Sequence, residues 1–518
     1  MQHLTTQHLT TQHLIRHGFP AALVMFGLAA CADVPTSTKS SVPTVPVASV
    51  SAAESDHGKH IVTFSGSHAP ADFAARVTAR GGAVDEILDG PGLAIVSGLT
   101  AAAAADLSAT EGINAVATDK TILADPSDDE TFARNPSAAS NLTSGDESVD
   151  GLEDDSDEGS PRRDGLPDRA TYYAYQWNMR AIKARAAWEA GHLGSPDVTV
   201  YLLDTGIDYE KADLEGRVDK SRSISLVPSA SKPDEYAQAK AEHVEPFMDF
   251  HSHGTAVAST IVSNGVDFAG VSTQTTLVAV KVLNRTRVGL VSTFLRGITY
   301  AADSSADIIH LSLSFPGFPR AGNEQTIAQV DAATTYAHNQ GAVIVVAAGN
   351  AASDLDGDWW RFCNAKYVIC VSATGPTRAV SPTRQLHVDE PAAYTNFGVN
   401  TITVAGPGGT DAPNLRVRVN CSGHSLITTG NPAPCGAHAP WFETVGTTYS
   451  AAAVSGLAAL IVSRVGHSRV GPERADRIRK VLTESADDLG PRGPDKFYGE
   501  GRINVARAMA MRFQRGIQ

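Results

Sequence analysis

Two short motifs carry side chains that suit acid–base chemistry. Asp204 follows the apolar run 198–203, and Gly206 permits a sharp turn just after it. His253 stands beside Gly254 where a helix is predicted to begin, so one ring nitrogen can be held while the other moves a proton. A carboxylate that orients a histidine is the arrangement that activates a nucleophile in acyl transfer.

A third motif, Gly446–Gly456, offers hydroxyl groups at the start of another predicted helix. They belong to Thr448 and Ser450. Asn350 follows the apolar run 342–348, and its amide could donate a hydrogen bond to a developing oxyanion. Together the motifs supply a nucleophile, a base, an orienting acid and an oxyanion donor.

Two other chemistries use parts of the same pattern. An Asp-Thr-Gly segment is half of an aspartic-protease dyad, but the chain holds no second copy of it. His251 and His253 have a spacing found in metal hydrolases, but no further placed ligands accompany the pair. We therefore expect catalysis without a cofactor or a catalytic metal, whereas the sequence leaves structural calcium open.

Alternating strands and helices are predicted to position these residues. Four near-continuous apolar runs are typical of strands buried on both faces of a parallel sheet: 198–203, 276–283, 308–313 and 342–348. Helices are predicted over 292–302, 327–339, 449–465 and 471–486. In such α/β folds active residues collect at the carboxyl ends of strands.

A separate small domain is predicted over 59–122. Its strands are predicted at 60–64, 83–88, 92–97 and 113–117, and its helices at 70–80 and 100–108. The order βαββαβ predicts a small α+β (ferredoxin-like) domain with helices on one face of a sheet. Residues 123–169 are dense in acids and poor in apolar side chains, which predicts a disordered linker. Its acids lack the spacing of a calcium loop.

The four motifs resemble the subtilisin family of serine peptidases. The matching segments follow the family's order, acid before histidine before nucleophile: Asp204-Thr-Gly, His253-Gly-Thr, Gly349-Asn350 and Gly446-Thr. Supporting matches cover most of the region from Trp177 to Met509. The resemblance implies a three-layer α/β fold with a mostly parallel sheet over 170–512, and hydrolysis of peptide bonds in polypeptide substrates.

The resemblance also implies roles for single residues. Asp204 would orient His253 and stabilise its imidazolium, and His253 would act as general base and then as general acid. Asn350 would donate to the oxyanion. The strand that pairs with the substrate backbone would include Ser312, Leu313 and Ser314.

The nucleophile is where the chain departs from the family. Aligning the glycines of the third motif puts Thr448 at the position of the nucleophilic Ser. Ser450 is the alternative nucleophile, but it lies about 200° further around a helix and is expected to face away from His253. Ala452 and Ala453 replace the family's Pro and His. Three functions stay open: an endopeptidase with a Thr nucleophile, a catalytically silent fold that binds peptides, and a metal-dependent hydrolase that uses His251 and His253.

The domain at 59–122 resembles the inhibitor-type propeptide of subtilisins in its element order and its Gly81-Gly82 turn. This resemblance implies that the chain carries its own propeptide as an intramolecular inhibitor. Arg162-Arg163 in the linker is a plausible place for processing.

The N-terminal residues resemble a bacterial lipoprotein signal. A short apolar run ends in Leu28-Ala-Ala-Cys31, similar to a lipobox, so 1–30 would be removed and Cys31 acylated. Residues 31–58 would form a flexible tether to the membrane. The resemblance implies export, and Ala32 after the Cys favours the outer membrane. A plain signal peptide is the alternative.

Charge and cysteines add two expectations. The net charge of −14 argues against a nucleic-acid partner.

An even number of further cysteines in an exported chain predicts disulfides. Three pairings are possible, and we favour Cys363–Cys370 and Cys421–Cys435 because each closes a short segment. No pair has the close spacing of a zinc site.

Overall fold

The computed structural model describes most of the compact unit Glu54–Gln518. The described residues are 58–123, 165–228, 234–312, 317–377, 388–411, 415–425, 441–466 and 471–512. Several predicted sites lie outside them: the signal with Cys31, Leu313, Ser314 and Cys435.

Residues 59–118 form a four-stranded antiparallel sheet in the order β2-β3-β1-β4. Its elements are β1 (Lys59–Phe64), α1 (Phe73–Thr78), β2 (Ala83–Leu88), β3 (Leu93–Ser97), α2 (Ala101–Ser108) and β4 (Ile113–Thr118). This is the βαββαβ order expected from the sequence. α1 is shorter than the predicted 70–80, whereas α2 begins as predicted because the Thr100 side chain accepts the N–H of Ala103.

The two faces of this small sheet are covered by different parts of the chain. On one face Phe73 of α1 packs edge-to-face on Phe64, with ring centroids 4.9 Å apart. On the other face Ile61 and Ile95 share an apolar cluster with Phe294 of α7 (Val291–Asp303). Burying a side chain of this size contributes about 1.5–3 kcal/mol, so this contact stabilises the docking of the sheet.

Eight of the strands that the structure describes form the central sheet, in the order β15-β14-β12-β10-β6-β8-β7 with β16 beside β14. The strands are β6 (Thr199–Asp204), β7 (Ile224–Ser225), β8 (Thr276–Lys281), β10 (Ile308–Leu311), β12 (Val343–Ala347), β14 (Val368–Gly375), β15 (Glu390–Pro391) and β16 (Val404–Pro407). Every pairing is parallel except that of β14 with β15. The ends of β6, β10 and β12 therefore meet at one edge.

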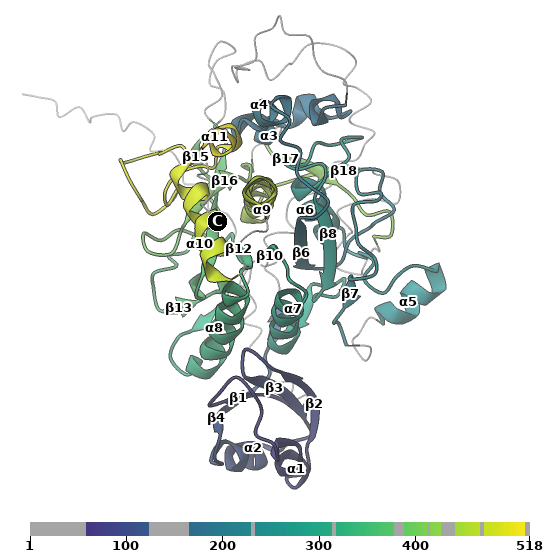
Figure 1. The fold of residues 1–518 in the computed structure, drawn as a ribbon, viewed down its shortest axis with the longest axis vertical. Coiled ribbons are helices and arrows are strands. Elements are labelled where there is room, and N and C mark those ends of the chain that lie inside the picture. The colour runs from purple at the N-terminus through teal and green to yellow at the C-terminus, as the bar shows by residue number, and fades with distance from the viewer. Residues whose placement is uncertain are drawn as a thin grey trace, which may run out of the picture. The chain divides into compact units, whose positions relative to one another are not determined.

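Helices cover both faces of this sheet (Figure 1). Leu202 packs in the cluster that includes α6 (His253–Ile261) and α9 (Thr447–Val465). The next residue, Leu203, packs in the cluster that includes α7 and α8 (Glu324–Asn339), since alternate residues of a strand point to opposite faces.

The helix α9 lies in the core. Among the described residues it is the one helix whose length and mean hydropathy of 1.4 would suit a membrane span, yet 83% of that stretch is buried inside the protein. Such burial is typical of the central helix of a globular domain.

Shorter elements complete the described chain. They are β5 (Thr121–Leu123), α3 (Trp177–Ala181), α4 (Ala184–Glu189), α5 (Glu235–Glu242), β9 (Val288–Leu290), β11 (Phe318–Pro319), β13 (Trp359–Trp360), β17 (Val417–Asn420), β18 (Trp441–Thr444), α10 (Pro472–Glu484) and α11 (Val505–Ala510), with 3-10 turns at Pro167–Arg169, Tyr173–Tyr175 and Phe362–Asn364.

The predicted linker is ordered at both of its ends. Leu123 belongs to β5, which pairs with β9. Asp168 is buried and lies 3.4 Å from the Arg185 guanidinium. The prediction that 123–169 is a disordered linker was therefore wrong at these residues, because Leu123 pairs with a distant strand and Asp168 forms an ion pair with Arg185.

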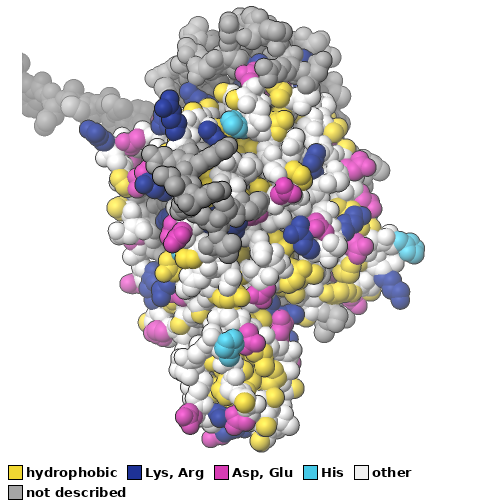
Figure 2. All heavy atoms as spheres, viewed as in Figure 1, with side chains coloured by type: hydrophobic (Ala, Val, Ile, Leu, Met, Phe, Trp, Pro, Cys, Tyr) yellow, Lys and Arg dark blue, Asp and Glu magenta, His cyan; other side chains and the backbone are white. Residues whose placement is uncertain are grey.

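One predicted disulfide is confirmed: Cys363 and Cys370 are bonded. Cys421 is also disulfide-bonded. Its predicted partner, Cys435, lies outside the described residues, so that pairing stays a prediction. On the face shown in Figure 2, basic and acidic side chains are interspersed.

Candidate active site

Asp204 and His253 form a direct pair at the edge of the central sheet. Asp204 ends β6 and His253 begins α6. The His253 Nδ1 lies 2.7 Å from Asp204 Oδ1, and both side chains are buried. The other carboxylate oxygen, Oδ2, has no hydrogen-bond partner among the described residues. The Nδ1–H donates to the carboxylate, which leaves Nε2 of the ring to exchange a proton.

Two glycines make this approach possible. Gly206 has φ +116°, and a Cβ there would lie 2.4 Å from the carbonyl oxygen of Phe247. A Cβ on Gly254 would lie 2.1 Å from the carbonyl oxygen of Gly206. Any side chain at either position would therefore push the histidine away from the acid.

Asp249 organises the turn before the histidine. Its carboxylate accepts the backbone N–H groups of His251, Ser252 and Thr255 at 2.8–3.0 Å. Burial favours a higher pKa for Asp249, but the Lys281 ammonium and these hydrogen bonds lower the pKa overall. An ionised Asp249 thus fixes the start of α6, where Ser252 adopts a left-handed φ of 95°.

The two candidate nucleophiles point differently. Ser450 Oγ donates to the carbonyl of Gly406 on β16 at 2.9 Å, so it faces the sheet, away from His253, as the helix geometry predicted. Thr448 is buried and its Oγ1 has no hydrogen-bond partner in the described part of the chain. Thr448 and His253 lie in the first turns of α9 and α6, which pack against each other.

Asn350 lies beyond the end of β12, and hydrogen bonds from Thr447 orient its side-chain amide. Its Oδ1 accepts the N–H of Thr447 at 2.9 Å and the Thr447 hydroxyl at 3.0 Å. That hydroxyl is in turn 2.9 Å from the N–H of Gly349. With Oδ1 held as the acceptor, the amide presents its Nδ2 donor on the other side. Asn350 is therefore fixed beside the residue that precedes Thr448.

Of the three predicted substrate-strand residues, Ser312 is described. Its side chain is buried, and its hydroxyl lies 3.3 Å from the carbonyl oxygen of Thr448. Leu313 and Ser314 fall outside the described residues.

A metal pair at His251 and His253 finds no support in the geometry. His251 Nδ1 accepts the backbone N–H of His253 at 3.3 Å, and the two ring centroids are 6.3 Å apart. Within the described ranges, the group of side chains whose ligand atoms converge does not include either residue.

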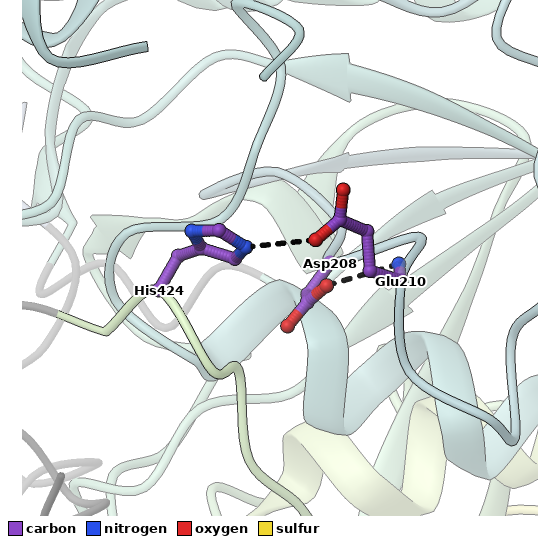
Figure 3. Close-up of side chains that lie close together, drawn as sticks. All are labelled: Asp208, Glu210 and His424. Atoms are coloured by element: carbon purple, nitrogen blue, oxygen red, sulfur yellow. Dashed lines mark hydrogen bonds and ion pairs between the residues drawn. The ribbon is translucent and has the colours of Figure 1, made fainter. Parts of the chain in front are cut away.

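That converging group is Asp208, Glu210 and His424, whose candidate ligand atoms lie within 4.8 Å of one another. In Figure 3 the His424 ring points at the Glu210 carboxylate, 3.2 Å from Nε2. Glu242 lies 2.7 Å from the other nitrogen, Nδ1.

We interpret this group as an ion-pair cluster. Burial opposes the charge on His424, but Glu242 and Glu210 outweigh it and raise the His424 pKa. Glu242 and Glu210 therefore act as ion-pair partners of the His424 ring. Asp208 binds the adjoining segment instead, accepting the N–H of Gly423 at 2.8 Å. The cluster thus fastens the segment 422–425 near the start of α6.

Comparisons with known proteins agree with this arrangement. A model of the subtilase family of peptidases matches residues 195–501. The chain belongs to the subtilase family. The matched span of this subtilase includes Asp204, His253, Asn350 and Thr448, and the expected subtilisin-like α/β fold with a mostly parallel sheet is confirmed.

The subtilase resembles several characterised relatives in sequence. It is 28% identical to the thermophilic serine proteinase of Bacillus sp. strain AK1 over 348 residues. The aligned region covers 66% of this chain and 69% of that protein. It is 25% identical over 346 residues to thermitase of Thermoactinomyces vulgaris, covering 66% of this chain and 99% of thermitase.

Solved structures show the same fold. The epidermin leader peptide processing protease of Staphylococcus aureus aligns with a TM-score of 0.63 at 16% identity, covering 88% of this chain and 99% of that one. Fervidolysin from Fervidobacterium pennivorans, a keratinolytic enzyme, aligns with a TM-score of 0.62 at 20% identity, covering 88% of this chain and 61% of fervidolysin.

The sequence motifs did not reveal the residues that hold the site in place. Thr447 orients Asn350 and Asp249 orders the turn at His253, and neither was predicted. Thr447 lies within the motif Gly446–Gly456 and Asp249 lies four residues before His253, so the sequence places both near the site. Their hydrogen-bond partners were not, since Thr447 and Asn350 are 97 residues apart.

Proposed function

We propose that this subtilase is an exported endopeptidase whose triad is Asp204, His253 and Thr448. The observation that carries the proposal is the 2.7 Å Asp204–His253 pair, buried at the carboxyl edge of the sheet. The buried Thr448 hydroxyl has no hydrogen-bond partner among the residues that the structure describes, which supports its place as the third member of the triad. An unpaired buried hydroxyl costs about 1–3 kcal/mol, which a functional role would account for.

The proposed reaction follows acyl-transfer chemistry. Thr448 Oγ1 forms a bond to the scissile carbonyl carbon while His253 Nε2 takes its proton, and Asp204 stabilises the imidazolium. Asn350 Nδ2 donates to the oxyanion. The C–N bond then breaks as His253 returns the proton to the leaving amine. Water, deprotonated by His253, hydrolyses the acyl-threonine and restores the hydroxyl.

We further propose that the N-terminal domain inhibits the peptidase until it is removed. Its last strand, β5, pairs antiparallel with β9 just before α7. Asp119 accepts the Ser292 N–H at 3.0 Å and the Ser292 hydroxyl at 2.5 Å, at the start of α7 where an anion is favoured. Gln329 on α8 donates to the carbonyl of Ile61 at 3.0 Å. Backbone pairing, a helix cap and apolar packing together support tight docking.

The proposal for location rests on the sequence. The segment ending at Cys31 resembles a lipobox, and we propose a lipid anchor there with polypeptide substrates outside the cytoplasm. No cofactor is needed for the proposed reaction.

One observation favours the second candidate, a catalytically silent fold that binds peptides. Within the described ranges the Thr448 hydroxyl has no hydrogen-bond partner, and so no hydrogen bond to His253. Catalytic hydrogen bonds are often long before substrate binds, so the silent function is ranked second.

The deciding experiment is hydrolysis of an unfolded protein by the purified chain after removal of 59–122. The endopeptidase proposal predicts turnover that His253→Ala abolishes while the variant keeps its melting temperature. Binding of the same substrate without any turnover, in the wild type and in Thr448→Ser, would establish the silent fold instead.

A further inference from the structure

A second histidine lies buried beneath the proposed triad. His310 is the third residue of β10, in register with Leu202 on β6 and Val345 on β12, and it is fully buried. An imidazole at the centre of a sheet is tolerated only if its polar atoms are hydrogen-bonded. The proposed reaction does not use this ring, so its place in the sheet has another cause.

Both ring nitrogens of His310 have partners on different elements. Nδ1 is 2.8 Å from the hydroxyl of Ser455 on α9, and Nε2 is 2.7 Å from the hydroxyl of Ser312. The Ser312 hydroxyl is in turn 3.3 Å from the carbonyl oxygen of Thr448. The ring therefore links the middle of α9, the end of β10 and the first turn of α9.

The chemistry of these partners fixes the direction of each hydrogen bond. The Thr448 carbonyl can only accept, so Ser312 donates to it. Ser312 must then accept from His310 Nε2–H, and Nδ1 must accept from the Ser455 hydroxyl. A single neutral tautomer satisfies all three contacts, whereas the other tautomer leaves the Thr448 carbonyl without this donor.

The surroundings keep the ring neutral. Burial lowers the pKa of His310 to about 3, with Asp204 raising and His253 lowering it to lesser degrees. These are the two charged groups that act on the ring, Asp204 from the end of β6 and His253 from the start of α6. His310 is therefore uncharged at neutral pH and carries a single ring proton.

We propose that His310 is a positioning residue that acts through Ser312 to set the backbone of Thr448 and hence the place of its hydroxyl. The inference rests on the proposed function, in which Thr448 is the nucleophile. Since no described residue hydrogen-bonds to Thr448 Oγ1, the position of this hydroxyl depends on the backbone that carries it. The same contact ties that backbone to Ser312, the first residue of the predicted substrate strand.

Two substitutions of His310 each remove one of its hydrogen bonds, the bond to Ser312 or the bond to Ser455. In His310→Asn the amide ends where Nδ1 lies, so an acceptor for Ser455 is kept and the donor to Ser312 is lost. In His310→Gln the amide reaches the place of Nε2, so the donor to Ser312 is kept and the acceptor for Ser455 is lost. Each variant breaks one buried hydrogen bond, which makes them matched controls for stability.

We expect His310→Asn to lower kcat by roughly 10- to 100-fold with KM almost unchanged, since a misplacement of about 1 Å has that cost. His310→Gln should stay within about threefold of the wild type. The proposal is overturned if both variants lose kcat equally at equal melting temperature, or if Asn retains it and Gln does not.

Two measurements that do not depend on substrate hydrolysis test the role of His310 separately from the proposed peptidase function. Long-range ¹H–¹⁵N NMR should show His310 as the neutral Nε2–H tautomer throughout pH 5–8, and an Nδ1–H tautomer or an imidazolium would contradict the link. Amide exchange in the first turn of α9 should speed up in His310→Asn and not in His310→Gln. Should neither the wild type nor Thr448→Ser cleave any substrate, the proposed function fails, and these measurements still decide the role of His310.

Discussion

Replacing Thr448 with Ser should make the peptidase faster. The Thr448 backbone is held on both sides, by Thr447 hydrogen-bonded to Asn350 at 2.9 and 3.0 Å and by Ser312 at 3.3 Å from the Thr448 carbonyl. The hydroxyl can thus move only by rotation about χ1, which the β-methyl restricts. Because an error of about 1 Å costs roughly 100-fold in rate, removing the methyl should raise kcat by roughly 10- to 100-fold.

The same substitution should lower stability slightly. Thr448 is 1% exposed, so deleting its methyl removes about 1 kcal/mol of buried apolar contact. The assay is the initial rate on a fluorogenic peptide, with thermal unfolding measured in parallel. Ser450→Ala is the control: it loses the bond to Gly406 at about 1 kcal/mol but should keep its rate. A Thr448→Ser enzyme no faster than wild type would refute the steric reasoning, and loss of activity in Ser450→Ala would make Ser450 the nucleophile.

Four further predictions concern the rest of the chain. The fragment 59–122, added in trans, should slow hydrolysis by the mature domain, and an inert fragment at high concentration would exclude the inhibitor role. Cys31→Ala should move the protein from the membrane to the soluble fraction, so unchanged partition would exclude the anchor. Peptide mapping without reductant should recover Cys421 bonded to Cys435, and a different partner would overturn that pairing. The raised His424 pKa implies stability that is fully present below about pH 6.5 and lost as pH rises through the folded pKa. The gap in unfolding midpoint between wild type and His424→Gln should therefore shrink from pH 6 to pH 9, and a constant gap would contradict the ion-pair interpretation.

The elements that position the site were predictable where the pattern is local. Strands such as β2 and β12 are continuous apolar or alternating runs, and they appear within a residue or two of their predicted bounds. β16 was not predicted, because Val-Ala-Gly-Pro has little strand propensity and is held by its parallel pairing with β14. The polar helix α5 likewise has no apolar stripe to announce it.

The site residues were likewise predictable where a local motif marks them, and their long-range contacts were not. Asp204, His253 and Asn350 stand at strand or helix ends that short motifs mark, so their places could be predicted. The contacts that orient them join residues far apart in sequence, such as His310 and Ser455, separated by 145 positions. No local sequence pattern predicts that pairing, because it depends on how α9 crosses the sheet.

The most direct test of the central claim is to trap the nucleophile in the wild-type enzyme. After removal of 59–122, the protein is incubated with a fluorophosphonate, which phosphonylates an activated hydroxyl, and the adduct is mapped by tandem mass spectrometry. The account predicts one modified residue, Thr448, with labelling lost in His253→Ala and accelerated in Thr448→Ser. An adduct on Ser450, or labelling of Thr448 that does not depend on His253, would contradict it.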